Sequence, residues 1–520
     1  MMSKKGNLTK TIFTKIISTK KRLTIIRATK IPFSQIKVPQ KLGFIAFILL
    51  PSSYAYADIF HYSNFIPGDR AIGLGGAYAG VSDDAAGVIY NPAGLAFATT
   101  GDVSGSANAY YKKTITYKNI IDGSDFTEHS EGFVPSFFGG IQKLDNLIPG
   151  FAAGFAIYSP DNEVRDQNDF IASGSVRAFH RNVKLTATTL RADVAAALRI
   201  SSRFSVGMNI GFLNINELSQ EYQFSALPRN LSTTPYIIDF SGRIYGVDTS
   251  KISGKGDLSY IQSLNGNYKT AGQGIQSGLG TQIALGGNFV LGISAKTTFL
   301  LNQKFTYEGD KIYYQRFSNG QALTRDFLLP KESCPTEVTS HGGVCSDPAN
   351  FDEVTSQSAQ PLPGQNAQRA SNNEPYGKWP VAIRGGFAWF ATPRFLWTFD
   401  VEHNTAVNDI GLATNYRTAV TNFATGMEYY VTPSLPFRVG AFTNFDARPE
   451  LQAGKYNSQQ ERIDYYGATG YLTWAQASSQ VGFGSIYQWG RGKANKLGSA
   501  AQQDINASSA SFLFSAAHML

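Results

Sequence analysis

The chain has 520 residues, and its composition is unusual for a soluble enzyme: it contains 51 Gly, 36 Phe and 26 Tyr but only 2 Cys, and only 16% of its residues are charged. The formal net charge of +8 arises in residues 1–57, which hold 11 Lys and Arg and no Asp or Glu, whereas the remainder holds 35 basic and 38 acidic residues. Residues 58–520 are therefore not basic, and their charge gives no reason to predict nucleic-acid binding.

Residues 1–57 read as an export signal with an extended basic region. The apolar run Leu42–Leu50 follows the basic stretch, Pro51 ends it, and Ala55–Ala57 supplies a small-x-small cleavage site. The alternative is a membrane anchor, but the run is about half of the roughly 20 apolar residues that a helical span needs. We therefore expect a mature chain that starts near Asp58.

Residues 58–100 do not alternate and are rich in small residues. We expect tight turns and short helices here, with Asp83 and Asp84 placed to favour a helix that starts at Ala85. This segment is called the plug below, because a family resemblance described later in this section implies that role.

From residue 101 to residue 520 the pattern has a period of two, which is typical of strands. In the segment 187–200, the apolar Leu190 and Val194 share one face and the charged Arg191 lies on the other. The predicted strands are 102–117, 131–143, 150–159, 186–200, 203–222, 275–286, 288–308, 378–391, 394–408, 417–431, 435–447, 463–474, 478–490 and 508–520.

These strands predict an all-β fold: a transmembrane antiparallel β-barrel of about 14 strands, preceded by an N-terminal segment of turns and short helices. A soluble sandwich would also alternate, but its polar face would carry more Lys and Glu, whereas here that face is rich in Gly and Ser. No long apolar run follows residue 57, so membrane residence would have to be through strands. The expected location is the outer membrane, as a multi-pass protein.

The segments 223–274 and 309–377 are long and polar, and we expect them to be extracellular loops. Cys334 and Cys345 lie close together in the second segment, which predicts a disulfide in an oxidising compartment; two free thiols are the alternative. No metal site is predicted, because the only nearby imidazole is that of His341.

The plug sequence resembles the N-terminal hatch of the FadL/TodX family of outer-membrane hydrophobic-compound transporters. The residues that carry this resemblance are Gly68–Arg70, Gly75–Ala77, Asp83–Ala85 and Asn91–Leu95, followed along the barrel by Gly154–Pro160, Leu279–Lys296, Trp379–Asp400 and Phe437–Gly440.

The resemblance implies a fourteen-stranded barrel that is closed by the plug and acts in passive uptake of long-chain fatty acids, hydrocarbons or aromatic compounds. It also implies capture in an apolar groove among the outer loops, passage to a pocket near the mature N-terminus, and lateral exit through a gap by the third strand. The expected partners are these hydrophobic small molecules, outer-membrane lipid and lipopolysaccharide. No cofactor, no catalytic residue and a monomeric state are expected.

Three groups of site residues are predicted. Asn91, Pro92 and Ala93 are the proposed gating element, placed against the third strand; a purely structural turn is the alternative. Phe60, Phe65 and Ile66 are the proposed substrate pocket, with ordinary packing of the plug as the alternative. The third group consists of charged residues that alternation places in the lumen. These are Arg191, Asp193, Lys296, Arg384, Asp400, Glu402, Glu428 and Arg438.

Two roles remain open for the lumen charges: they bridge strands and anchor the plug, or one or two cations bind a substrate carboxylate. Two other classes of function also remain open. One is a surface adhesin or interaction barrel that acts through its loops, and the other is a secretion-associated barrel similar to PorV. An outer-membrane phospholipase is disfavoured, because His403 falls on the predicted lipid face and no Gly-x-Ser-x-Gly motif is present.

Overall fold

The computed structural model describes residues 60–519, with gaps. The gaps are 122–123, 174–175, 230, 232–234, 239–242, 256, 287, 341–342, 352, 360–378, 408–416, 452–458, 477 and 496–501. The predicted export signal, 1–57, lies outside the described residues.

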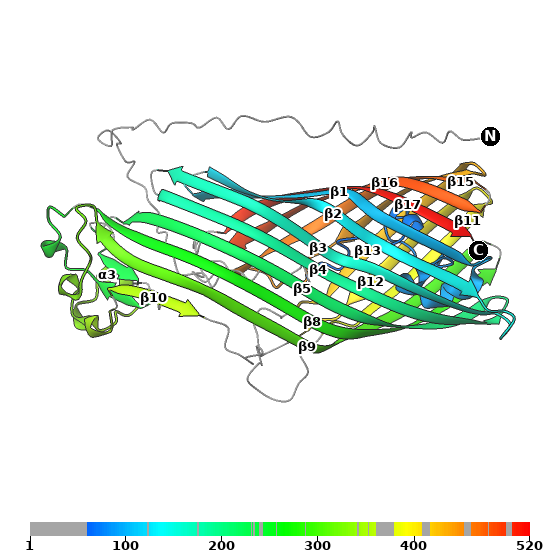
Figure 1. Cartoon of the computed structure of the whole chain (residues 1–520), viewed down its shortest axis with the longest axis horizontal. Coiled ribbons are helices and arrows are strands. Elements are labelled where there is room, and N and C mark those ends of the chain that lie inside the picture. Colours follow the sequence, from blue (N-terminus) through cyan, green and yellow to red (C-terminus); the bar gives the residue numbers. More distant parts are fainter. Residues whose placement is uncertain are drawn as a thin grey trace, which may run out of the picture. The chain divides into compact units, whose positions relative to one another are not determined.

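Fourteen antiparallel strands among the described residues form a closed ring, because β17 pairs with β1 and β8 pairs with β9 (Figure 1). The predicted barrel is confirmed, and each predicted strand matches one of the ring. The strands are β1 (Asp102–Ile121), β2 (Ser124–Lys143), β3 (Phe151–Ser173), β4 (Val176–Ser201), β5 (Phe204–Arg229), β8 (Leu258–Gly286), β9 (Phe289–Phe317), β11 (Ala382–Thr392), β12 (Phe395–Asn404), β13 (Val420–Thr432), β14 (Leu435–Asn444), β15 (Gln459–Gln476), β16 (Ser479–Asn495) and β17 (Gln503–Met519).

The bounds of the two predicted loops, 223–274 and 309–377, were wrong. β5 continues to Arg229, β8 already begins at Leu258, and β9 continues to Phe317. Away from lipid, both faces of a strand carry polar residues, so the strand loses its alternating hydrophobic signal while its backbone ladder continues.

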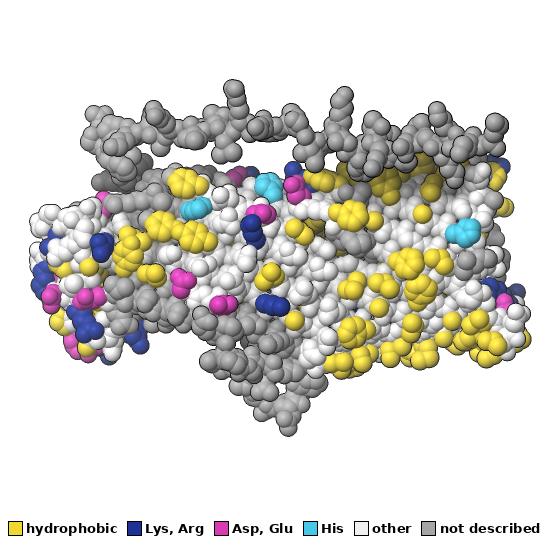
Figure 2. All heavy atoms as spheres, in the orientation of Figure 1, with side chains coloured by type: hydrophobic (Ala, Val, Ile, Leu, Met, Phe, Trp, Pro, Cys, Tyr) yellow, Lys and Arg dark blue, Asp and Glu magenta, His cyan; other side chains and the backbone are white. Residues whose placement is uncertain are grey.

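Apolar side chains alternate with buried polar ones along the wall. On β5, Met208 and Ile210 are 56% and 52% exposed, whereas Ser205 and Asn209 point inward and are buried. Figure 2 shows hydrophobic side chains gathered on the outer surface toward the right-hand end, while charged side chains lie mainly toward the left. Every strand of the closed ring is paired with a neighbour on each side over at least part of its length, so this chain is a multi-pass transmembrane barrel of the outer-membrane type.

The plug lies inside one end of the barrel, where its short helices are drawn in blue in Figure 1. They are α1 (Asp69–Gly73), α2 (Gly87–Tyr90) and the 3₁₀ helix η1 (Pro92–Phe97). Almost every described plug residue is buried, and the plug and the wall share one hydrophobic core. None of the helices among the described residues has the length and apolarity of a membrane span.

Short elements beyond the ends of β8 and β9 form an outer cap with its own hydrophobic core. They are β6 (Tyr236–Ile238), β7 (Ile244–Gly246), η2 (Thr249–Lys251), η3 (Arg325–Phe327), η4 (Lys331–Ser333), α3 (Thr336–Thr339), η5 (Pro348–Asn350) and β10 (Val354–Ala359). Cys334 and Cys345 form a disulfide within this cap, with their Cα atoms 5.5 Å apart.

Candidate functional site: the cavity between plug and wall

Side chains of the wall bind the plug through its backbone. Asp400 on β12 is 1% exposed and accepts hydrogen bonds from the N–H groups of Tyr78 and Ala79, both at 2.9 Å. Arg384 on β11 donates from Nη1 to the carbonyl oxygen of Gly76 at 2.8 Å. These contacts satisfy buried backbone groups that have no partner inside the short plug helices.

Asn91 joins the plug to β8. Its Nδ2 donates to the carbonyl oxygens of Ala79 at 2.9 Å and Thr281 at 3.0 Å, and its Oδ1 accepts from Ala93 N at 3.2 Å. A Cβ added at Gly280 would lie 2.1 Å from Asn91 Oδ1, so the glycine makes room for this contact. Asn91 thus lies against β8 and not against the third strand as predicted, whereas η1, which begins at Pro92, also contacts β3.

The neighbours of Asn91 also lie against other strands. The carbonyl oxygen of Ala93 accepts a hydrogen bond from Ser205 Oγ on β5 at 2.8 Å. A Cβ added at Gly207 on β5 would come within 2.5 Å of the peptide between Pro92 and Ala93. Glycines of the wall thus let the plug backbone pack directly on the strands.

An ion-pair cluster fixes the first plug helix. Arg70 donates from Nε and Nη2 to the two carboxylate oxygens of Glu428 on β13, each at 3.0 Å. Arg438 on β14 donates from Nε to the same carboxylate at 2.5 Å. Glu428 is 2% exposed, so each guanidinium compensates a carboxylate that has lost its water.

The turn before α2 holds a partly buried carboxyl group. Asp84 accepts hydrogen bonds from Tyr78 Oη at 2.6 Å and Ala86 N at 2.9 Å. Burial, together with the neighbouring carboxylates of Asp69 and Asp83, raises the pKa of Asp84 to about 7. The folded plug therefore binds this proton more tightly than an unfolded chain would, so this group favours docking as the pH falls from about 7 toward the usual carboxyl range.

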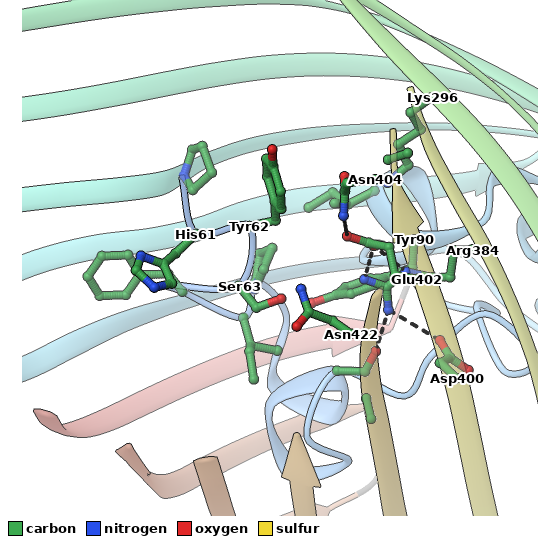
Figure 3. Close-up of a pocket in the computed structure, with 18 of the residues that line it drawn as sticks. His61, Tyr62, Ser63, Tyr90, Lys296, Arg384, Asp400, Glu402, Asn404 and Asn422 are labelled. Atoms are coloured by element: carbon green, nitrogen blue, oxygen red, sulfur yellow. Dashed lines mark hydrogen bonds and ion pairs between the residues drawn. The ribbon is translucent and has the colours of Figure 1, made fainter. Parts of the chain in front are cut away.

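A cavity of about 190 Å³ lies between the plug and the wall (Figure 3). Tyr62 and Tyr90 of the plug line it, together with Lys296, Glu402 and Asn422 of the wall. An engineered apolar cavity of about 150 Å³ already admits benzene, so this volume suits an aromatic ring or part of an alkyl chain.

Two of the three predicted pocket residues line this cavity. Phe65 and Ile66 do, whereas Phe60 does not. The backbone of Phe60 bonds to Ala447, and its ring packs in a separate cluster with Val420. Phe60 is therefore a packing residue at the start of the plug, which corrects its predicted place in the pocket.

The charged residues at the cavity fall into two groups. Arg384 is fully engaged, since it pairs with Glu402 through Nε at 2.8 Å and approaches Asp400 at 3.3 Å. By contrast, Arg191 and Lys296 make no hydrogen bond or ion pair with any described residue. Arg191 only faces the Trp379 ring, 5.8 Å from its centroid. The cavity thus exposes two cations that lack a direct hydrogen bond or ion pair among the described residues, although the carboxylates of Asp193 and Glu402 act on them electrostatically.

Asp193 does not neutralise these cations directly. Its Oδ2 accepts a hydrogen bond from Tyr158 Oη at 3.2 Å, and its Oδ1 is buried without a partner. A Cβ added at Gly211 would lie 1.6 Å from Oδ1, so the glycine leaves space for the carboxylate.

The strand ladder of the wall breaks where the cavity meets β3. β2 and β3 are paired only as far as the rung between Phe137 and Tyr158. Beyond it, residues 124–136 of β2 and 159–173 of β3 have no ladder between them, although β2 remains paired with β1 and β3 with β4. We call this unpaired stretch the seam.

Proline and strand irregularity account for the break. Pro135 on β2 and Pro160 on β3 both stand just past the last rung, and the pairing of each strand with its other neighbour shifts register there. Proline has no N–H to donate to a ladder. Tyr158, Pro160 and Asp161 also line the cavity, so the cavity reaches the base of the seam.

Several residues of the site were not predicted. Arg70 stands in the Gly-Asp-Arg element of the plug, so its partnership with Glu428 could have been inferred from two opposite charges on predicted inward positions. Trp379 stands in a predicted strand and opens a segment that carries the family resemblance, but no place at the cavity was predicted for it. Pro135 lies within a predicted strand and Pro160 just past the end of another, and a proline in such a place indicates a bulge or an edge.

No family model matches the chain, and no curated protein matches it. Solved structures do match. A Pseudomonas aeruginosa FadL homologue is 14% identical, with 86% of this chain and 97% of that chain covered at a TM-score of 0.48. The toluene transporter TodX of P. putida is 13% identical, with 86% and 97% covered at 0.47. The toluene transporter TbuX of Ralstonia pickettii is 11% identical, with 87% and 98% covered at 0.48. The three similarities extend over most of each chain at low sequence identity, and they concern overall architecture.

Proposed function

We propose that the chain is an outer-membrane channel for the passive uptake of hydrophobic compounds, which are held in the cavity and leave sideways through the seam. The observation that carries this proposal is that the cavity ends at Tyr158, Pro160 and Asp161, where the ladder between β2 and β3 stops. Transfer from an apolar cavity into the bilayer keeps the cargo out of water, which matters because each buried methylene is worth about 0.8 kcal/mol.

The lateral exit can be closed by an engineered disulfide. A Cβ added at Gly132 on β2 would lie 3.7 Å from Val164 Cβ on β3, which is within the usual Cβ–Cβ range of about 3.5–4.5 Å for a disulfide. The variant Gly132→Cys/Val164→Cys should therefore tie the two edges of the seam together without moving the backbone.

We expect the oxidised double variant to lose uptake of radiolabelled oleate and of a radiolabelled alkane, and to regain it after reduction. The two single variants and the natural chain serve as controls under the same treatment, since the natural disulfide of the cap is reduced in all of them. Equal uptake by the oxidised and reduced forms would rule out exit through the seam.

The unpaired cations favour a cargo with a carboxylate. Arg191 and Lys296 line the cavity beside apolar plug residues, and a carboxylate seated between them would supply the direct hydrogen-bonded partner that they lack among the described residues. We therefore propose long-chain fatty acids as the preferred cargo, with the head group at Arg191 and Lys296 and the chain toward Phe65 and Ile66.

Lys296→Met separates a fatty acid from a hydrocarbon. Uptake of oleate should fall about tenfold, because a charge-assisted hydrogen bond contributes about 1.5–3 kcal/mol, whereas uptake of an alkane should not fall. Lys184→Met is the matched control, since Lys184 on β4 is exposed and pairs with Asp166. If oleate and alkane uptake fell together, the cation would be structural and the preference for an acid would be wrong.

A further inference from the structure

A side chain replaces the missing backbone rung at the far end of the seam. Gln167 on β3 accepts a hydrogen bond at Oε1 from His129 N at 3.1 Å and donates from Nε2 to the carbonyl oxygen of Thr127 at 2.9 Å. Thr127 and His129 are alternate residues of β2, so the amide engages one N–H and one C=O on the same strand edge. Those are the two groups that a paired strand would bind there.

The position of Gln167 is in register with the lower ladder. Gln167 lies nine residues beyond Tyr158 on β3, and Glu128, between Thr127 and His129, lies nine residues before Phe137 on β2. The two strands thus stay level across the seam, and a side-chain amide bridges them where their backbones do not pair. Gln167 Nε2 also donates to Asp169 at 2.6 Å, which fixes the orientation of the amide.

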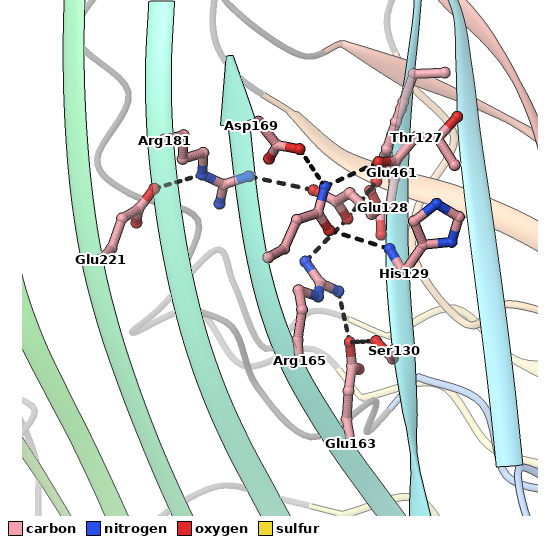
Figure 4. A network of polar contacts seen from close by, with 12 residues as sticks. Thr127, Glu128, His129, Ser130, Glu163, Arg165, Asp169, Arg181, Glu221 and Glu461 are labelled. Atoms are coloured by element: carbon pink, nitrogen blue, oxygen red, sulfur yellow. Dashed lines mark hydrogen bonds and ion pairs between the residues drawn. The ribbon is translucent and has the colours of Figure 1, made fainter. Parts of the chain in front are cut away.

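Charged groups on the lumen side reinforce this bridge (Figure 4). Arg165 on β3 donates to Glu128 on β2 at 3.0 Å and to Glu163 at 2.5 Å, and Ser130 on β2 donates to Glu163 at 3.1 Å. Glu128 and Glu163 are 3% and 7% exposed, so these contacts are shielded from water and screened little by salt.

Further charges tie the bridge to the next strands. Arg181 on β4 donates to Glu128 at 3.3 Å and to Glu221 on β5 at 2.8 Å. The network therefore runs from β2 across β3 and β4 to β5, and any separation of β2 from β3 at this height has to break it. We call Gln167, Arg165 and their partners on β2 the latch.

The latch lies above the apolar part of the wall. The outward residues His129 and Glu131 of β2 beside it are polar, whereas Phe133, lower on the same strand, is 62% exposed. On β3, Val164 is 36% exposed at the level of Gly132. The unlatched part of the seam therefore has apolar edges, and the latched part meets the polar head-group region.

We infer that the latch sets the upper limit of the lateral opening, so that apolar cargo leaves into the bilayer below it while water-soluble molecules are kept out of the lumen above it. This inference rests on the proposed exit through the seam. Its readout is leakage of polar solutes, so that a failure of the latch and a failure of hydrophobic uptake can be told apart.

Gln167→Leu keeps much of the volume of the side chain but removes both bonds to β2. Each hydrogen bond of ordinary strength shifts an equilibrium by about fivefold, so the open time of the seam should rise about twentyfold. We expect a matching rise in channel openings in planar bilayers and greater sensitivity of cells to vancomycin. Gln142→Leu is the matched control, because Gln142 lies on β2 within the intact ladder and bonds only to its neighbour Lys143.

Arg165→Gln provides a second, independent perturbation in case the Gln167→Leu chain does not insert into the membrane. For each variant, a heat-dependent shift in gel migration identifies the folded barrel. Introducing the Gly132→Cys/Val164→Cys pair into the Gln167→Leu chain locates the leak: oxidation should abolish it. Folded Gln167→Leu and Arg165→Gln channels that leak no more than Gln142→Leu would overturn the inference.

Discussion

Replacing Asn91 by alanine should loosen the plug by about 3 kcal/mol. Asn91 is fully buried, and its amide makes three hydrogen bonds, to Ala79, Thr281 and Ala93. Each bond contributes about 1 kcal/mol net, and alanine leaves the buried carbonyl oxygens without this donor. One of the three bonds joins the plug to the wall and two lie within the plug, so all three are lost only when the plug both undocks and unfolds. An equilibrium changes tenfold for each 1.4 kcal/mol, so the fraction of chains with an undocked and unfolded plug should rise about 150-fold.

A buried thiol can report this fraction. Ser82 is fully buried in the plug. Because Cys334 and Cys345 are joined in a disulfide, the thiol of a Ser82→Cys variant would be the free thiol that maleimide can label among the described residues. Its rate of maleimide labelling in detergent should rise about 150-fold when Asn91→Ala is added. Asn302→Ala is the matched control, because Asn302 is exposed on β9 and bonds only to Gln273; it should change the rate by less than about threefold.

Asn91→Asp is a stricter test of the same reasoning. It keeps the acceptor for Ala93 N but turns a carboxylate oxygen toward the carbonyl oxygens of Ala79 and Thr281, so labelling should be faster than for Asn91→Ala. If both variants labelled at the rate of the natural residue, the hydrogen bonds of Asn91 would not hold the plug.

Two further predictions concern the plug contact and the cap. Gly292→Ala places a Cβ 1.9 Å from the carbonyl oxygen of Ala79, so it should lower the temperature of the heat-dependent gel shift by several degrees. Gly385→Ala is the control: its Cβ would meet nothing within 4 Å, so the temperature of the gel shift should not change. Cys334→Ser/Cys345→Ser removes a short-loop disulfide worth about 3 kcal/mol, so trypsin should cut the cap faster while the barrel keeps its gel shift. Equal cutting with and without the disulfide would contradict the second expectation.

The number of strands could be predicted because lipid imposes a chemical difference between the two faces of each one. On β4, Val194 faces outward at 57% exposure while Asp193 points inward at 2%, and such contrasts recur around the ring. The lengths of the strands could not be predicted, because outside lipid a residue such as Lys269 on β8 meets water on the outer face, and the hydrophobic period disappears.

The position of the plug was harder to predict than its existence. The composition indicates compact turns rich in small residues. The groups that Asn91 contacts, however, depend on where glycines of the wall leave room for its side chain. Gly280 and Gly292 on neighbouring strands accommodate its amide, and their place on the inward face was readable from alternation. The role of Gln167 could not be read at all, since it depends on the register of β2 and β3 across a stretch without a ladder.

The relative cost of two routes out of the cavity favours the sideways one. Passage downward requires the plug to leave, and ten of the hydrogen bonds between plug and wall would have to break, which costs about 10 kcal/mol at about 1 kcal/mol each. Between the last rung at Phe137 and the latch at Gln167, the described residues of β2 and β3 share no backbone ladder, so parting the strands there breaks no backbone pairing between them. A passive channel has no energy source to remove the plug in each cycle, and apolar cargo that enters the seam compensates the contacts it displaces. Under the proposed function, we therefore expect the wall rather than the plug to yield.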